Sequence, residues 1–328
     1  MFDTSALVSR IKKTQLIDII QSPVIGGNTS ESEFLIFLKP EMFMASDDKL
    51  NTQRVDVVLQ KLTAFNVRID GIIAVNGRFI EKKQIMANHY GLINTMSNKA
   101  SALVTPEDRK TMTKLLGEDC TTTTVLGGHE ALKQFPQFTP PSLDEFWFTR
   151  KSLRVRSGYY FQKYEINNQV CLLVNAFHPY QLAYFTDPSH FVLLLVCHSN
   201  TAWKTLRWQM IGDTFPEKAD PGSVRGTLCA RYQELGFPKK VDISCNGIHF
   251  SVGPFEALRE LNNFIGNALG RNIIFETAFA KRMLEKGIPR ERIELSLQNP
   301  LVSVAGQEKE LFASTEDTDP DEAIEIYR

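Results

Sequence analysis

The feature that most constrains the fold of this chain is an alternation of short apolar runs with longer segments of helical periodicity. The first run, 34–38, stops at Lys39-Pro40, and the second, 67–75, stops at Asn76-Gly77. Short apolar runs bounded by turn-forming residues are typical of β-strands. Between the two runs, residues 46–48 can cap a helix whose apolar side chains share one face. The core therefore begins with a predicted β-α-β unit.

The same alternation continues along the chain. Residues 79–96 have helical periodicity, 191–196 form a third apolar run, and the helix after it is expected to end at Ile211. A fourth strand is predicted at 241–244, and an amphipathic helix at 255–265, where apolar residues recur at three- and four-residue spacing. The core order, β-α-β-α-β-α-β-α, predicts an α+β fold in which helices cover one face of a mostly antiparallel sheet.

Sequence outside this core suggests additional parts. A separate helix is predicted at 5–20, and a second one at 272–286 is stopped by a glycine and a proline. The acidic stretch that starts at Thr315 is expected to be a solvated tail. The predicted organisation is an N-terminal helical extension at 1–30, a split core domain at 31–98 and 178–266, an inserted subdomain at 99–177, and a C-terminal helical extension with an acidic tail at 267–328.

Composition and charge exclude several classes of protein. The chain has 328 residues and a formal net charge of -1, which argues against a nucleic-acid-binding surface but allows a local basic pocket for phosphates. The longest apolar run, 191–197, is too short to span a bilayer, so no membrane partner is expected. The N-terminus lacks the basic and apolar regions of a signal peptide, and the five cysteines form no CxxC pair. We expect a cytoplasmic protein with buried thiols.

Common signatures of nucleotide and metal sites are missing from the sequence. There is no GxxxxGK[ST] and no GxGxxG phosphate loop. The six histidines lack the spacing of HExxH and have no partnering cysteine pair, so no metal site built from protein ligands is expected. Gly128-His129-Glu130 is a weak signal, because a histidine in a loop is usually only solvated.

Several short segments nevertheless occur in an informative order. They are Lys39-Pro40, His89-Tyr90, Gly212-Asp-Thr214, Ala219-Asp-Pro-Gly-Ser-Val-Arg225-Gly226, and Asn246-Gly-Ile-His249-Phe-Ser251 followed by Glu260. In this order they resemble the nucleoside diphosphate kinase family, whose ferredoxin-like domain carries an Asn-x-x-His-x-Ser signature after a Pro-Gly-Thr-(Ile/Val)-Arg-Gly segment. The resemblance covers 34–98 and 178–265. It implies a ferredoxin-like antiparallel sheet interrupted by the inserted subdomain.

The resemblance also implies a reaction with a phosphohistidine intermediate. His249 would take the γ-phosphate of a nucleoside triphosphate such as ATP and pass it to a nucleoside diphosphate. A neutral imidazole suits this role because it is nucleophilic near neutral pH. Glu260 would hold the other ring nitrogen, and Ser251 would bond to that carboxylate.

The remaining implied contacts concern the nucleotide. Lys39, Tyr90, Thr214 and Arg225 would bind the phosphates, and Asn246 together with Lys39 would contact the ribose. Magnesium would be held mainly by the nucleotide phosphates. In the family an aromatic residue stacks on the base, and the counterpart here is Tyr180. The family assembles into oligomers, so the resemblance allows a homo-oligomer, but the insert and the C-terminal helices can cover the same surfaces.

Some positions depart from the family pattern. A second phosphate-binding arginine is expected six residues before Thr214, but Trp208 stands there and Arg207 precedes it. Either the helix carries an extra residue and Arg207 makes the contact, or the contact is missing. A small residue after the histidine is replaced by Phe250. Two hypotheses follow: an active kinase, or a catalytically weak or inactive kinase-like nucleotide-binding or scaffold module.

Overall fold

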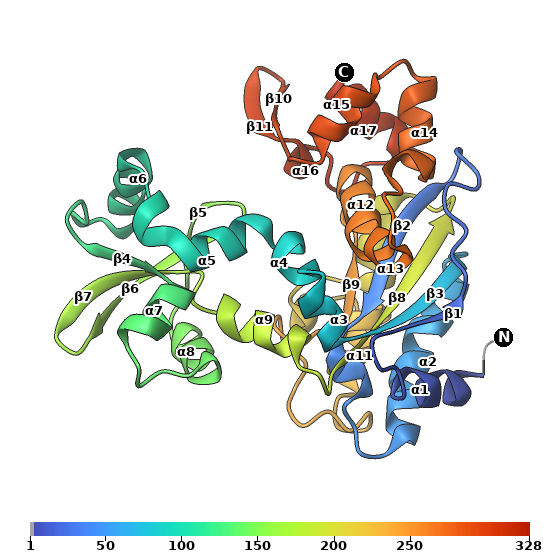
Figure 1. Ribbon diagram of the computed structural model, residues 1–328, viewed down its shortest axis with the longest axis horizontal. Coiled ribbons are helices and arrows are strands. Elements are labelled where there is room, and N and C mark those ends of the chain that lie inside the picture. The colour runs from blue at the N-terminus through green and yellow to red at the C-terminus, as the bar shows by residue number, and fades with distance from the viewer. Residues whose placement is uncertain (1–2) are drawn as a thin grey trace. The chain divides into compact units, whose positions relative to one another are not determined.

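The computed structural model describes residues 3–328 and divides the chain into two compact units. The first unit combines the N-terminal part up to Lys83 with Pro188–Arg328, and the second is Gln84–Asp187 (Figure 1). Both units mix helices with strands, so the predicted α+β class is confirmed. Within residues 3–328, none of the helices combines the length and the apolar character that a bilayer crossing needs.

The first unit is built on a five-stranded sheet. Its strands lie in the order β1 (Ile17–Gln21), β3 (Arg68–Asn76), β8 (Phe191–Ser199), β2 (Ser32–Leu38) and β9 (Ile248–Phe250). Every neighbouring pair is antiparallel, as predicted. In Figure 1 the sheet carries β1 at one edge and the short β9 at the other. The edge strand β9 holds His249.

Helices pack on both faces of this sheet, so the prediction of helices on one face was wrong. Alternate residues of β2, such as Ile36, pack with α1 (Thr4–Ile11) and α2 (Asp48–Ala64). On the opposite face, the ring of Phe37 stacks on Phe264 at 5.1 Å between centroids. All seven residues of β2 are buried. A continuous apolar run is typical of a strand covered on both sides.

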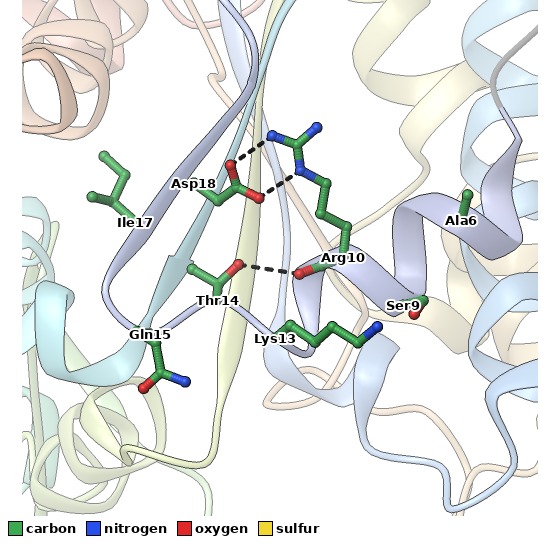
Figure 2. A pocket seen from close by; sticks show the side chains of 8 residues that line it. All are labelled: Ala6, Ser9, Arg10, Lys13, Thr14, Gln15, Ile17 and Asp18. Carbon is green, nitrogen blue, oxygen red and sulfur yellow. Dashed lines mark hydrogen bonds and ion pairs between the residues drawn. The ribbon is translucent and has the colours of Figure 1, made fainter.

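The N-terminal segment is only partly helical, so the prediction of one helix over 5–20 was wrong. Helix α1 ends at Ile11, and residues 17–21 form β1, which pairs with β3. Figure 2 shows the turn between them, where Thr14 Oγ1 donates to the carbonyl of Arg10 and the Arg10 guanidinium pairs with Asp18. Three isoleucines in β1 favour extended backbone because β-branched side chains fit a pleated strand well.

The acidic C-terminal stretch is folded, so the prediction of a solvated tail was wrong. Residues Pro320–Tyr327 form α17, in which Ala323, Ile324 and Tyr327 are buried. Residues 323, 324 and 327 are one, three and four positions apart, so they share one face of the helix. The ring of Tyr327 packs against Phe255 of α12 at 5.0 Å between centroids. The acidic side chains occupy the other positions of this stretch.

The strand predicted at 241–244 is absent from the described residues. The carboxylate of Asp242 accepts hydrogen bonds from the backbone amides of Ser244 and Cys245 at 3.0 Å, which closes a turn. The strand begins later, at Ile248. His249 therefore lies within a strand rather than after one.

The second unit has a sheet of its own. Its strands lie in the order β4 (Thr124–Gly127), β7 (Gln169–Val174), β6 (Tyr159–Ile166) and β5 (Leu153–Arg156), with β4 parallel to β7. Its helices are α4 (Ile85–His89), α5 (Gly91–Leu103), α6 (Pro106–Leu116), α7 (Gly128–Gln134), α8 (Pro140–Trp147) and α9 (His178–Thr186). The unit begins earlier and ends later than the insert predicted at 99–177, whose domain boundaries stay a prediction.

The remaining helices belong to the first unit. They are η1 (Pro40–Phe43), α3 (Gly77–Lys82), α10 (Trp203–Thr205), η2 (Leu206–Ile211), η3 (Pro216–Lys218), α11 (Val224–Ala230), α12 (Pro254–Leu261), η4 (Asn262–Gly266), α13 (Asn267–Leu269), η5 (Ile274–Glu276), α14 (Ala278–Glu285), α15 (Arg290–Ser296) and α16 (Leu311–Ser314). A hairpin of β10 (Leu301–Val304) and β11 (Gln307–Glu310) precedes α16. Together with α12 and η5, α14 to α17 surround a small apolar core.

A buried arginine on α2 fastens two loops to the sheet domain. The guanidinium of Arg54 donates to the carbonyls of Glu41, Leu235 and Gly236 at 2.7 to 2.9 Å. It also lies over the ring of Phe237, at 4.1 Å from the centroid. Only 1% of Arg54 is exposed. Each of these carbonyls would lose a hydrogen-bond partner without the guanidinium, and such a loss is costly in a buried site.

We predict that Arg54→Met lowers the free energy of unfolding by about 3 kcal/mol, because three carbonyls lose their donor. Urea unfolding followed by circular dichroism measures the change. Arg10→Met is the matched control, because it breaks the solvent-exposed pair with Asp18 and should alter stability far less. Equal losses in the two variants would contradict this role of Arg54.

Candidate active site

His249 lies on the edge strand β9, directly opposite Phe37 of β2. The imidazole stacks on the Phe37 ring with 4.4 Å between centroids and an angle of 13° between the planes. Its side chain is 17% exposed, so the ring is held by packing but can still be reached from solvent. This exposure is suited to a reactive histidine, whereas a purely structural one is usually enclosed.

One buried carboxylate binds His249 of β9 and Ser251, the residue directly after that strand. Glu260 Oε1 lies 2.8 Å from His249 Nε2, and Glu260 Oε2 accepts the hydroxyl of Ser251 at 2.5 Å. Residues two apart in an extended strand point to the same face, so His249 and Ser251 can share one partner. Ser251 Oγ also bonds with the backbone of Leu35 at 3.2 to 3.3 Å. The three residues that the resemblance grouped are therefore brought together.

Phe250 points away from His249. It belongs to the opposite face of the sheet, is 3% exposed, and packs against Phe34 at 5.1 Å and Trp203 at 5.9 Å between ring centroids. The alternation of side chains along a strand places it there. Its bulk therefore fills the core and leaves the imidazole side of β9 uncrowded.

A second group joins Lys39, Asn246 and Thr214. Lys39 Nζ donates to Asn246 Oδ1 at 2.6 Å, and Asn246 Nδ2 donates to the carbonyl of Thr214 at 3.4 Å. Burial lowers the pKa of Lys39 below its ordinary value, and the nearby charge of Glu41 opposes that shift. The contact of Thr214 in this structure is through its backbone, and its side chain is exposed.

Arg225 connects this group to the strand of His249. It is an early residue of α11, and its guanidinium donates to the carbonyls of Gly212 at 2.9 Å and Ile248 at 3.1 Å. Burial lowers the pKa of Arg225 to about 10, and the charge of Arg207 acts in the same direction. Among the residues that the structure describes, the buried Nε of Arg225 has no hydrogen-bond partner. A buried donor of this kind is available to an anionic ligand.

Arg207 lies in a helix with wider turns than an α-helix. Residues 206–211 form a π-helix, and the amide of Gly212 donates to the carbonyl of Arg207 at 2.9 Å, five residues earlier. Such a turn accommodates one added residue within a helix. The guanidinium of Arg207 is bound by Asp317 at 2.9 Å and by Glu316 at 2.6 Å. Both carboxylates come from the C-terminal segment.

Glu41 was not predicted to belong to the site, yet it shapes the loop before His249. Glu41 Oε1 accepts the amide of Gly247 at 2.8 Å, and the amide of Lys39 donates to the carbonyl of Gly247 at 2.9 Å. Gly247 has a φ of 77°, and a Cβ there would lie 2.6 Å from Leu228 Cδ1 and 2.9 Å from Met42 Sδ. The one sequence signal for Glu41 is its position directly after Lys39-Pro40.

The two aromatic residues of the predicted site belong to the other unit. Tyr90 lies between α4 and α5, and Tyr180 lies in α9. The ring of Tyr90 packs edge-on against His178 at 6.0 Å between centroids. Burial lowers the pKa of His178 to about 4, so this histidine is neutral near pH 7. The roles of Tyr90 and Tyr180 toward a nucleotide stay predictions.

Comparisons with known proteins give limited information. No protein-family model matches the chain, and no curated protein matches it. Among solved structures, an NDP kinase from Pyrobaculum aerophilum is 16% identical, with 71% of this chain and 95% of that chain covered and a TM-score of 0.34. The geometry of the site, rather than this distant likeness, carries the function proposed below.

We predict that Gly247→Ala destabilises the protein by about 2 kcal/mol more than Gly287→Ala does, because only the former also inserts a methyl group against packed atoms. Both glycines have a positive φ, but a Cβ at Gly287 meets nothing within 4 Å. Urea unfolding of both variants measures the difference. Equal losses would show that the packing around Gly247 adds no constraint of its own.

Proposed function

We propose that this protein is a nucleoside diphosphate kinase that transfers the γ-phosphate of a nucleoside triphosphate to a nucleoside diphosphate through phosphorylated His249. The observation that carries the proposal is the contact of His249 Nε2 with the buried carboxylate of Glu260, at 2.8 Å. This contact fixes both the ring orientation and the nitrogen that would react. The partners are nucleoside di- and triphosphates, with ATP as a donor.

The contact assigns separate roles to the two ring nitrogens. A carboxylate at Nε2 favours the tautomer in which Nε2 carries the proton, so the lone pair resides on Nδ1. Nδ1 of His249 attacks the γ-phosphorus, a phosphorus–nitrogen bond forms, and the bond to the bridging oxygen of the β-phosphate breaks. The nucleoside diphosphate leaves with that electron pair. The imidazolium ring keeps its proton on Nε2, where Glu260 balances the positive charge.

The second half-reaction follows the same path in reverse. A terminal phosphate oxygen of the acceptor nucleoside diphosphate attacks the phosphorus on Nδ1, and the phosphorus–nitrogen bond breaks. The electron pair returns to the ring, and His249 is again neutral with its proton on Nε2. One carboxylate, Glu260, therefore serves both steps without gaining or losing a proton.

Cationic groups next to β9 support phosphate binding. Arg225 is bonded to the carbonyl of Ile248, the residue before His249, and its charge lowers the pKa of the partly buried Lys39. Preorganised cations in a poorly solvated site stabilise charge that develops on transferring phosphoryl oxygens. The buried Nε of Arg225 offers a further donor. In this proposal Asn246 and Lys39 contact the ribose, and Thr214 contacts a phosphate.

The site fits a magnesium ion that binds together with the nucleotide phosphates. Cationic groups, Lys39 and Arg225, border the strand of His249, and they would repel a metal ion that arrived without phosphates. Magnesium is commonly held by substrate phosphates together with water, and when bound it would neutralise phosphate charge. Lys39 and Arg225 would then bind the phosphate oxygens that the ion leaves uncovered.

A kinase-like binding or scaffold module remains the second candidate. The observation that favours it is the engagement of Arg207 by Glu316 and Asp317, which removes one cation from the phosphate site as the structure stands. A scaffold would bind a nucleotide without taking its phosphate. Phosphorylation of His249 discriminates between the two candidates.

Incubation with γ-labelled ATP and magnesium is expected to give a label that is stable to base and labile to acid, as a phosphohistidine is. His249→Ala should abolish the label, because Nδ1 is lost. His190→Gln is the matched control and should label fully, because the substitution keeps the backbone carbonyl of His190 that accepts the amide of Gly77 and the side chain of Asn76. Addition of GDP should then remove the label. A wild-type protein that binds ATP but never labels would favour the scaffold.

Glu260→Gln is expected to slow phosphorylation of His249 by about 10- to 100-fold in single-turnover measurements, because the amide keeps a hydrogen bond but cannot balance the imidazolium charge. Ser251→Ala should have a smaller effect, since it removes only a partner of that carboxylate. Circular dichroism verifies that both variants are folded. An unchanged rate in Glu260→Gln would contradict the role given to this carboxylate.

A further inference from the structure

A short acidic segment near the C-terminus lies against the strand of His249. We call residues 315–319, Thr-Glu-Asp-Thr-Asp, the acidic strap; it connects α16 with α17. The amide of Asp317 donates to the carbonyl of Val252 at 2.9 Å. Asp319 Oδ1 accepts the backbone amide of Trp203, whose indole Nε1 in turn donates to the carbonyl of Ser251 at 2.9 Å. The strap therefore packs directly beside the residues that follow His249.

The backbone of the strap is tightly packed in this place. A Cβ on Gly253 would lie 2.5 Å from the carbonyl oxygen of Thr315, so only glycine allows this approach. The hydroxyl of Thr318 donates to the same carbonyl at 2.8 Å, and Asp317 adopts a left-handed φ of 64°. Asp and Asn tolerate that conformation better than most residues. The strap has a defined structure rather than being a loose tail.

Two carboxylates of the strap take up the guanidinium of Arg207. Glu316 binds Nη2 at 2.6 Å and Asp317 binds Nη1 at 2.9 Å, and Asp317 also accepts the indole of Trp208 at 2.8 Å. Each terminal nitrogen of Arg207 thus has one carboxylate. A phosphate that binds an arginine in a bidentate manner uses the same fork of nitrogens. If the carboxylates served only to orient Arg207, one of its two terminal nitrogens would stay available to bind a phosphate.

Arg207 and the strap both act on the site of His249. The π-helix η2 that carries Arg207 packs against β9. Burial lowers the pKa of Arg225, which is bonded to the neighbour of His249, and the charge of Arg207 acts in the same direction. Burial and the charge of Glu260 raise the pKa of Glu256, and Glu316 adds to that shift. The strap therefore places two carboxylates on an arginine whose helix packs against the strand of His249.

We propose that the acidic strap is an autoinhibitory element, in which Glu316 and Asp317 compete with the phosphates of the nucleotide for Arg207. The inference rests on the proposed function and adds a regulatory step to the same site. Exchange is feasible because Glu316 is 42% exposed and Asp317 is 23% exposed, so solvent screens both ion pairs. A phosphate carries more charge than a carboxylate and makes a stronger bidentate contact with arginine.

The test compares ADP binding by isothermal titration calorimetry in the full-length protein, with and without magnesium. The strap variant combines Glu316→Gln with Asp317→Asn, which removes both charges and keeps a residue at 317 that tolerates a positive φ. The matched control combines Asp321→Asn with Glu325→Gln, which also removes two charges and breaks two arginine pairs, those with Arg282 and Arg328. A third protein carries the strap variant in an Arg207→Ala background.

The strap variant is expected to lower the Kd of ADP by about threefold to tenfold, because Arg207 no longer has an internal anion. The control should match the wild type, and the gain should vanish in the Arg207→Ala background. A strap variant that binds ADP equally well or more weakly would overturn the proposal and make the strap a positioning or purely structural element.

Labelling of His249 distinguishes a failure of the autoinhibition proposal from a failure of the proposed kinase function. If the strap variant shows no gain in binding but the wild type is phosphorylated, autoinhibition is wrong and the kinase function stands. If neither protein binds ADP nor labels, both inferences are wrong. If the wild type binds ADP poorly and the strap variant binds it tightly, the proposal is supported even where transfer is slow.

Discussion

The candidate site depends on one buried carboxylate that joins a short edge strand to a helix. Strand β9 has three residues and, within residues 3–328, pairs with β2 alone, so its backbone bonds hold it weakly. Glu260 of α12 compensates by bonding to His249 of β9 and to Ser251, which directly follows the strand. A carboxylate that is 2% exposed needs such partners, because an uncompensated buried charge is costly. The same contact therefore supports the strand and orients the imidazole.

Much of the site could be predicted from the sequence because its spacing reflects local geometry. His249 and Ser251 are two residues apart, as one face of a strand requires, and Glu260 follows on the next helix. The strands at 34–38, 67–75 and 191–196 were equally predictable, since apolar runs bounded by turn residues have few alternatives. In these cases the neighbouring residues alone decide the local structure.

Most parts that sequence reasoning missed depend on contacts between residues far apart in the chain. Glu41, for example, reaches Gly247 across the domain. The missed turn at 241–244 is local instead, because the Asp242 side chain binds amides two and three residues further on. The acidic stretch after Thr315 has the composition of a solvated segment, yet α17 buries one face against the core built on α12. Composition reports average polarity, whereas packing depends on which few side chains share a face.

The π-helix at 206–211 has a consequence for how such a site can change over time. An added residue in an α-helix rotates everything beyond it by about 100°, which would turn a binding side chain away from its ligand. Here the wide turn ending at Gly212 confines that rotation to a few residues. The segment downstream keeps its connection to Arg225 through the carbonyl of Gly212. A π-helix can take up an added residue without displacing the segments that follow it, so the sequence spacing across such a helix is a poor guide to which side chains lie together.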